Sequence, residues 1–201
     1  MRIRSCSNPF KGLKTFEPFE LTKFFPAFSN ALDVEIGFGQ SPFIINYAAA
    51  HPQRCIVGIE TLVKAVTLMQ QKITAAKLEN IHLINGNGAQ ALRDAFADYS
   101  IDRIFIFHPT PWLKRKHLKR RLITQELINS MHTKLKPGGC VYFSTDVQEL
   151  WEEVCHLFAQ QKAFAAADDV DFWANYYSTR WHEMSKEKNR ETFCATFCLQ
   201  R

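Results

Sequence analysis

The feature that most constrains the fold of this chain is a regular alternation of short apolar runs with helical patterns. The runs that predict strands cover residues 32–36, 55–59, 81–84, 102–107 and 140–144. The helical patterns that follow these runs cover residues 41–50, 61–76, 89–96, 120–135 and 147–161. Strands and helices that alternate in this way form a parallel sheet with helices on both faces. A last apolar run over residues 193–199 predicts an antiparallel strand at the C-terminal edge of that sheet.

Composition and hydropathy narrow the class of protein. Apolar residues make up 46% of the chain and charged residues 22%, as in globular proteins, so extensive disorder is excluded. No apolar run approaches the roughly 18 residues that a membrane span needs, and the N-terminus lacks the apolar centre of a secretory signal. We therefore expect a cytoplasmic protein with no membrane partner.

The six cysteines are scattered along the chain, and no two have the C-x-x-C spacing of a zinc site. Cys55, Cys140, Cys194 and Cys198 lie in apolar, strand-like runs, which predicts small buried side chains. Because nothing marks the chain for secretion, we expect neither a disulfide framework nor a bound metal.

Positive charge is concentrated in one segment, residues 114–121, which holds six Lys or Arg residues and no acid. Because the whole chain carries a net charge of +5, the remainder is close to neutral. Such a segment is typical of a protein that binds nucleic acid, although a solvated charged surface is an alternative. Its last cations would begin the helix predicted over residues 120–135, where the helix dipole disfavours them, which suggests a functional role.

A glycine-containing loop follows the first predicted strand, in the sequence Glu35-Ile36-Gly37-Phe38-Gly39-Gln40-Ser41-Pro42. Ligands of doubly wound sheets bind beyond the carboxyl ends of the strands, and glycines let the backbone turn there and approach a ligand. A dinucleotide-binding fingerprint would need glycine at position 42. The loop instead fits S-adenosylmethionine, which has no pyrophosphate group.

Polar residues at the ends of the next strands predict the rest of a cofactor site. Glu60 ends the second strand, where a carboxylate can accept hydrogen bonds from ribose hydroxyls, and Glu35 could pair with an ammonium group. Asn87 and Gly88 follow the third strand, and Asn87 could contact the adenine edge. Taken singly, each acid could be a helix cap or a solvated carboxylate, and Asn-Gly could be an ordinary turn.

The fourth strand runs into Phe107-His108-Pro109-Thr110-Pro111-Trp112-Leu113-Lys114 and the cationic segment. This stretch resembles the F-P-D-P-W-x-K motif and basic run of the bacterial tRNA (guanine-N7)-methyltransferases of the TrmB type. Further motifs of that family are matched by Glu35–Gly39, Leu135–Gly139 and Thr145-Asp146, and its N-terminal lead-in by Arg4 with Asn8-Pro9. The resemblance covers nearly the whole chain.

The resemblance implies a Rossmann-like class I S-adenosylmethionine-dependent methyltransferase fold in one domain over residues 1–201. That domain would comprise an N-terminal lead-in (1–30), a cofactor-binding core (31–162) and a C-terminal edge and substrate region (163–201). The implied activity is methyl transfer from S-adenosylmethionine to N7 of a guanine in the variable loop of tRNA. The implied partner is tRNA, and the expected state is a monomer or a homodimer.

The resemblance and the patterns above together give a set of expected site residues. We expect the cofactor to contact Glu35, Gly37, Gly39, Glu60, Asn87, Gly88 and Thr110. We expect RNA or the target guanine to contact Trp112, Lys114, Lys116, Lys119, Arg120, Arg121, Asp146, Thr179 and His182. The expected catalytic residues are Thr110, at the position of the family's catalytic aspartate, and Asp146, the remaining acid opposite the cofactor loop. For Trp112, which could stack on an extracted base, a structural anchor is the alternative.

Three family carboxylates are replaced in this chain, by Asn87, Thr110 and His182. Guanine N7 has a free lone pair and no proton, so its methylation needs alignment rather than a general base. We therefore expect retained but slower methyl transfer. The alternatives are a non-catalytic tRNA-binding paralogue and a methyltransferase of the same fold with another substrate.

Overall fold

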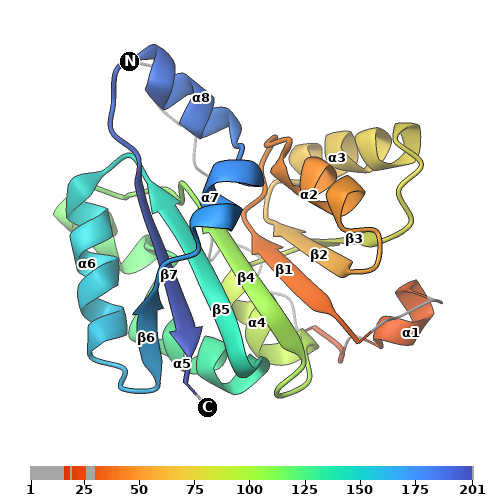
Figure 1. Cartoon of the computed structure of the whole chain (residues 1–201), viewed down its shortest axis with the longest axis horizontal. Coiled ribbons are helices and arrows are strands. Elements are labelled where there is room, and N and C mark those ends of the chain that lie inside the picture. The colour runs from red at the N-terminus through yellow and green to blue at the C-terminus, as the bar shows by residue number, and fades with distance from the viewer. Residues whose placement is uncertain (1–15, 19, 26–29, 201) are drawn as a thin grey trace.

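The computed structural model describes residues 16–18, 20–25 and 30–200. The lead-in motif of Arg4 with Asn8-Pro9 lies outside the described residues. Seven strands form one sheet in the described part of the chain (Figure 1). They are β1 (Leu32–Ile36), β2 (Cys55–Glu60), β3 (Ile81–Asn85), β4 (Ile101–Phe107), β5 (Leu135–Thr145), β6 (Phe164–Ala167) and β7 (Phe193–Leu199).

Helices separate the strands, and five of them follow the first five strands in the order that the sequence predicts. They are α1 (Leu21–Phe24), α2 (Phe43–Ala50), α3 (Val63–Ala75), α4 (Gly88–Ala95), the 3-10 helix η1 (Arg115–Arg120), α5 (Gln125–Lys134), α6 (Gln148–Ala159), α7 (Val170–Asn175) and α8 (Arg180–Glu187). Helices α2, α3 and α7 pack against one face of the sheet, and α4, α5 and α6 against the other (Figure 1). No helix in the described ranges is long and apolar enough to cross a membrane.

The strand order β3-β2-β1-β4-β5-β7-β6 confirms the predicted sheet and locates its switch point. Strands β1 to β5 are parallel, and β1 pairs with β2 on one side and β4 on the other. The direction in which the strand order runs therefore reverses between β1 and β4, and ligands of such sheets bind beyond that point.

The C-terminal part of the sheet differs in one respect from the prediction. Strand β7 is antiparallel to β5 as expected, but it lies inside the sheet because β6 pairs with its other side. The sequence did not indicate β6, because Phe164–Ala167 is four residues long and contains no β-branched side chain. The expected antiparallel edge is therefore a pair of strands.

Strand β4 shows how the sequence produces a core on both faces. Ile104 and Ile106 point into the aliphatic cluster that α4, α5 and α6 cover. Phe105 and Phe107, which alternate with them, point into an aromatic cluster with Phe43 of α2. Successive side chains of a strand face opposite sides, so the continuous apolar run signals burial on both faces.

The cationic segment precedes helix α5 rather than beginning it. Helix α5 starts at Gln125, and the side chain of Thr124 accepts a hydrogen bond from the Leu127 backbone amide at 3.3 Å. The prediction of a helix from residue 120 was therefore wrong, and so was the expected conflict between the cations and its dipole. Residues Arg115–Arg120 form the 3-10 helix η1 instead.

A disulfide joins Cys140 of β5 to Cys198 of β7, which corrects the prediction of two unpaired thiols. These residues stand directly opposite each other in the antiparallel ladder, with Cα atoms 4.1 Å apart. Their separation of 58 residues along the chain hid this register from the sequence. Cys55 is buried as expected, whereas Cys194 is exposed.

Candidate functional site

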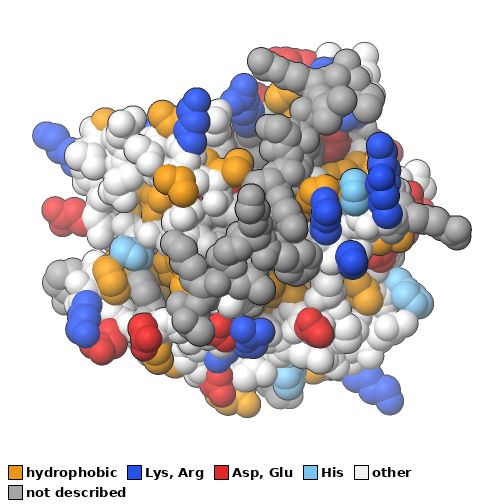
Figure 2. Space-filling model, turned by 180° about the vertical axis from the view of Figure 1, so that it is seen from behind, with side chains coloured by type: hydrophobic (Ala, Val, Ile, Leu, Met, Phe, Trp, Pro, Cys, Tyr) orange, Lys and Arg blue, Asp and Glu red, His pale blue; other side chains and the backbone are white. Residues whose placement is uncertain are grey.

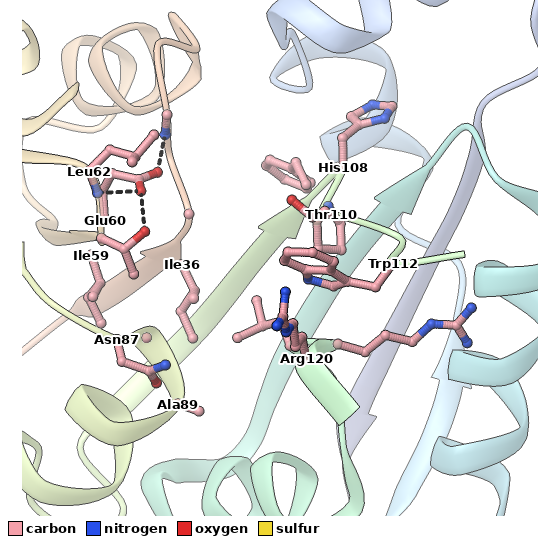
Figure 3. Close-up of a pocket in the computed structure, with 18 of the residues that line it drawn as sticks. Ile36, Ile59, Glu60, Leu62, Asn87, Ala89, His108, Thr110, Trp112 and Arg120 are labelled. Atoms are coloured by element: carbon pink, nitrogen blue, oxygen red, sulfur yellow. Dashed lines mark hydrogen bonds between the residues drawn. The ribbon is translucent and has the colours of Figure 1, made fainter. Parts of the chain in front are cut away.

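A pocket of about 510 Å³ opens at the carboxyl ends of the parallel strands. In Figure 3 one wall carries Ile36, Glu60 and Asn87, which follow or end β1, β2 and β3. The opposite wall carries Thr110 and Trp112, from the segment that connects β4 to η1. The pocket thus spans the switch point between β1 and β4, where the sequence predicts the cofactor.

The loop after β1 has the backbone conformation that its glycines permit. Gly37 has φ +80° and Gly39 has φ +54°, values that favour glycine, and both residues line the pocket. The last residue of β2 holds this loop in place, because the Gly39 amide donates a hydrogen bond to Glu60 Oε2 at 3.0 Å. The loop and the end of β2 therefore form one rigid edge of the pocket.

Glu60 organises the turn that follows β2 as well as the glycine loop. Its other carboxylate oxygen, Oε1, accepts hydrogen bonds from the Leu62 amide at 2.9 Å and the Thr61 hydroxyl at 3.0 Å. The side chain is buried yet still lines the pocket (Figure 3). A carboxylate fixed by three donors is preorganised to accept a further hydrogen bond from a ligand hydroxyl.

Glu35 lies beneath the pocket rather than in its wall. It is only 2% exposed, and its Oε2 atom has no hydrogen-bond partner among the described residues. Burial, reinforced by the nearby charge of Glu60, raises the pKa of Glu35 well above its ordinary value. A buried polar atom without a partner calls for an explanation, and a cationic group of a ligand at the adjacent glycine loop would supply one.

Asn87 and Gly88 start helix α4 at the pocket wall. The Asn87 side chain caps the helix by accepting a hydrogen bond from the Gln90 amide at 3.0 Å. A Cβ atom on Gly88 would lie 2.2 Å from Ile36 Cγ2, so glycine is required for α4 to pack against β1. Both residues line the pocket as predicted, and each also has a structural role there.

Thr110 lies on a stiff loop between two prolines, Pro109 and Pro111, and both Pro109 and Thr110 line the pocket. The neighbours of this pair of prolines, His108 and Trp112, have φ values of +46° and +44°. Side chains of this size rarely adopt the left-handed region, and such residues concentrate at functional sites. The loop therefore presents Thr110 in an imposed conformation opposite Glu60 (Figure 3).

The described cations of the segment 114–121 divide into two groups. Lys119, Arg120 and Arg121 line the pocket, whereas Lys114 and Lys116 are exposed outside it. Burial, followed by the positive charges of η1, lowers the pKa of His117. Figure 2, which views the molecule from behind, shows Lys and Arg side chains gathered around a histidine near one edge of the face in view. The pocket mouth therefore continues into a positively charged surface.

Arg121 also lines the pocket, but its side chain has partners within the protein. Its side chain is 4% exposed and forms ion pairs with Glu149, at 3.3 Å, and with Glu153 of helix α6. It also donates a hydrogen bond to the Pro111 carbonyl at 2.9 Å. Arg121 therefore anchors the Thr110 loop to α6, and its contact with RNA phosphate stays a prediction.

Asp146, a predicted catalytic residue, is not among the residues that line the pocket. Its side chain is 4% exposed, lies 2.7 Å from Arg190 and 3.6 Å from His108 Nδ1, and accepts a hydrogen bond from Ser185. The neighbouring His108 lowers the pKa of Asp146 to about 2, and Arg190 adds to the effect. The predicted catalytic acid is thus engaged behind the pocket wall.

His108 joins this cluster to the pocket. It is 5% exposed, its Nε2 atom lies 2.7 Å from the Tyr177 hydroxyl, and that hydroxyl donates to Ser144 at 2.8 Å. The sequence left His108 open, and the structure places it in the pocket lining with Asp146 behind it.

Helix α8 contributes a residue that the sequence prediction did not include. Thr179 caps this helix by accepting a hydrogen bond from the His182 amide at 3.1 Å, and His182 packs against Tyr177. Neither lines the pocket, so their predicted contact with RNA or guanine is not supported by position. Trp181 does line it, and the sequence signal for it was its place two residues after Thr179.

No group of three potential His, Cys, Asp or Glu ligands for a metal ion occurs in residues 16–18, 20–25 and 30–200. The pocket chemistry is instead a carboxylate-and-glycine wall facing a threonine, aromatic and cationic wall. Such an arrangement fits a nucleoside ligand with a positive group on one side and an anionic polymer outside the mouth.

Known proteins share both the sequence pattern and the fold. A family model described as "Putative methyltransferase" matches residues 29–194. A tRNA (guanine-N(7)-)-methyltransferase of Agrobacterium fabrum is 30% identical over 190 residues, which cover 92% of this chain and 82% of that protein. A protein of the same name from Nitrosococcus oceani is 35% identical over 131 residues. Those residues cover 65% of this chain and 56% of that relative.

Solved structures with a similar fold are more distant in sequence. The 16S rRNA methyltransferase KamB has a TM-score of 0.63 at 14% identity, with 92% of this chain and 96% of that chain covered. The aminoglycoside resistance methyltransferase NpmB1 has a TM-score of 0.59 at 16% identity, with 93% and 99% covered. These likenesses confirm the fold alone. The family match and the Agrobacterium relative together show that this chain belongs to the tRNA (guanine-N7)-methyltransferase family.

Proposed function

We propose that this protein transfers the methyl group of S-adenosylmethionine to N7 of a guanine in tRNA. The observation that carries the proposal is that a ligand pocket and a cationic surface adjoin at the carboxyl ends of the parallel strands. The glycine loop and Glu60 form a nucleoside pocket at the switch point of the sheet, and the cations of η1 continue from its mouth. We also propose a cytoplasmic location and a monomeric or homodimeric state.

The cofactor-facing residues have separable tasks. Glu60 is placed to accept hydrogen bonds from ribose hydroxyls, and the glycine loop lets the backbone approach the ligand. Glu35 offers its unpartnered oxygen to the ammonium group, and this contact would restore the ionised form that burial disfavours. S-adenosylmethionine, when bound, supplies an electrophilic methyl group on a sulfonium.

The substrate-facing residues align the base. Guanine N7 attacks with its own lone pair, so no side chain needs to remove a proton. Thr110, held between two prolines, can hydrogen-bond the base edge, and Trp112 can stack on an extracted base. Lys114, Lys116, Lys119 and Arg120 are placed to contact phosphates.

Methyl transfer can be tested directly with labelled cofactor. The protein is incubated with methyl-labelled S-adenosylmethionine and unmodified tRNA transcripts, and the RNA is digested to nucleosides. We expect label in 7-methylguanosine, and none with a transcript whose variable-loop guanine is replaced by adenine. Glu60→Gln keeps the shape but loses the charge that receives ribose hydroxyls, and should raise the KM for the cofactor.

The other outcomes separate the alternatives. Retention of tRNA without label would indicate a non-catalytic RNA-binding protein. Label in another nucleoside would indicate a methyltransferase with a different target. Either result would contradict the proposed reaction.

A further inference from the structure

Trp112 occupies a position that demands an explanation beyond packing. Its backbone has φ +44°, and its ring is part of the pocket lining. The residue before Trp112 is fixed, because it is a proline and Arg121 donates a hydrogen bond to the Pro111 carbonyl at 2.9 Å. The fold therefore fixes an indole ring at the mouth of the pocket in a conformation that bulky residues rarely adopt.

The face of this ring already carries a cation. The Arg120 guanidinium carbon lies 5.2 Å from the centre of the Trp112 ring, within the range of a cation–π interaction. In Figure 3 Trp112 lies between Thr110 and Arg120. His117 meets the indole at 5.5 Å with nearly perpendicular ring planes. Of these neighbours, Arg120 has the long, flexible side chain that can leave the ring while the loop stays in place.

The proposed reaction creates a cation at this place. The N7 lone pair forms the new N–C bond, and the S–CH₃ bond breaks with its electrons remaining on sulfur. The positive charge moves from sulfur to the purine, and no proton is transferred. Among the described residues lining the pocket the acids are Glu60 and Glu126, and neither belongs to the loop that carries Thr110. A carboxylate at residue 110, which could offset the purine charge, is absent.

We propose that the Trp112 face now covered by Arg120 is the seat of the target guanine, and that it favours the base in its cationic, N7-methylated form. In the absence of the base, the planar Arg120 guanidinium covers this ring face. When the base enters, Arg120 moves to an RNA phosphate. The inference rests on the proposed function, because the cation is the product of that reaction. The electron-rich indole face then supplies the stabilisation that a carboxylate would otherwise supply.

Mononucleotide binding tests the ring without requiring methyl transfer. The probes are 7-methylguanosine 5′-monophosphate and guanosine 5′-monophosphate, titrated into the whole protein. We expect the methylated nucleotide to bind roughly 3- to 30-fold more tightly, and Trp112→Leu to reduce this ratio to near unity. Equal affinities in the wild type, no binding of the methylated nucleotide at millimolar concentration, or an unchanged ratio in the variant would overturn the proposal.

Fluorinated tryptophan provides a version of the test that preserves shape. Fluorine withdraws electrons from the indole face, so the binding ratio should fall as fluorine atoms are added. The chain has three other tryptophans, and the matched control is therefore the same substitution in Trp112→Phe, where the ratio should not respond. A response of equal size in that control would show that another tryptophan is responsible.

Arg120→Gln gives two effects of opposite sign. It empties the ring face, so the methylated nucleotide should bind several-fold more tightly, and it removes a phosphate contact, so tRNA should bind more weakly. Lys116→Gln removes a charge from η1 outside the pocket. It should weaken tRNA binding without strengthening the binding of the methylated nucleotide. Weaker binding of the methylated nucleotide to Arg120→Gln would contradict the proposal that the base binds on the Trp112 face.

If tRNA is not methylated but the affinity ratio still depends on Trp112, the proposed function fails while the binding site on the ring stands.

Discussion

At the scale of single residues, Thr110 is the position where the chemistry and the sequence most clearly disagree. The resemblance places an acid here, whereas this chain holds a neutral hydroxyl on a loop fixed by Pro109 and Pro111. A carboxylate in this wall would stabilise charge that develops on the purine. We therefore expect the hydroxyl to lower the rate of methyl transfer without changing the reaction.

Thr110→Asp should raise kcat for tRNA methylation by roughly tenfold, which corresponds to about 1.4 kcal/mol of transition-state stabilisation. Thr110→Asn is the matched control, because it has the size of aspartate without its charge, and it should give no increase. The measurement is single-turnover methylation at saturating tRNA. A flat or reduced rate in the aspartate variant, with tRNA affinity unchanged, would show that this position does not limit the reaction.

Asp146 gives a second prediction, on stability. Its pKa in the folded protein is about 2, below the ordinary value near 3.9, so its ionised form stabilises the fold above that ordinary pKa. The contribution, about 2 kcal/mol, should be lost as the pH falls from about 4 towards 2. Asp146→Asn should therefore unfold at lower urea concentration than wild type at pH 7, with a smaller difference at pH 3. An equal difference at both pH values would contradict the ion-pair account.

At the scale of elements, the segment 114–121 around η1 contains both cations that hold the fold and cations that face solvent. Arg121 is nine-tenths buried on two glutamates of α6, whereas Lys114 and Lys116 are exposed. The sequence predicted the whole run as one cationic surface, because the partners of Arg121 lie about thirty residues away along the chain. Charge patterning alone cannot distinguish these two roles.

The exposed lysines should determine the salt dependence of tRNA binding. Lys114→Ala combined with Lys116→Ala should reduce the slope of log K against log[salt] by about 1 to 2, since each phosphate contact contributes roughly 0.7–0.9. The control removes two exposed lysines remote from the pocket, Lys72 and Lys162, and should leave the slope unchanged. The contrary outcome is an unchanged slope in the first variant, measured by filter binding across a salt series.

Elements with strong periodicity were predictable, and those held by distant partners were not. The runs that became β1, β2, β4 and β7 were recognised because each is rich in apolar residues. Helices α7 and α8 were not predicted, because they have six and eight residues and little apolar periodicity. Thr179 was assigned to RNA, although its side chain caps α8.

At the scale of the whole molecule, the alternation of elements was sufficient for the fold and for one wall of the site. Gly37, Gly39, Glu60 and Asn87 were found because each follows a strand that the sequence marks clearly. The position of Asp146 could not be found in this way, because its place behind the pocket depends on Arg190, which reaches it from the C-terminal part of the chain.

The central claim is that the rim between β1 and β4 binds S-adenosylmethionine beside a surface that holds RNA. The most direct measurement is a calorimetric titration of the protein with S-adenosylhomocysteine, the product of the transfer, with Gly39→Val as the control. We predict one site per chain in the wild type and loss of binding in the variant, since φ +54° disfavours a β-branched side chain there. No heat of binding at millimolar ligand, with the protein folded, would contradict the account.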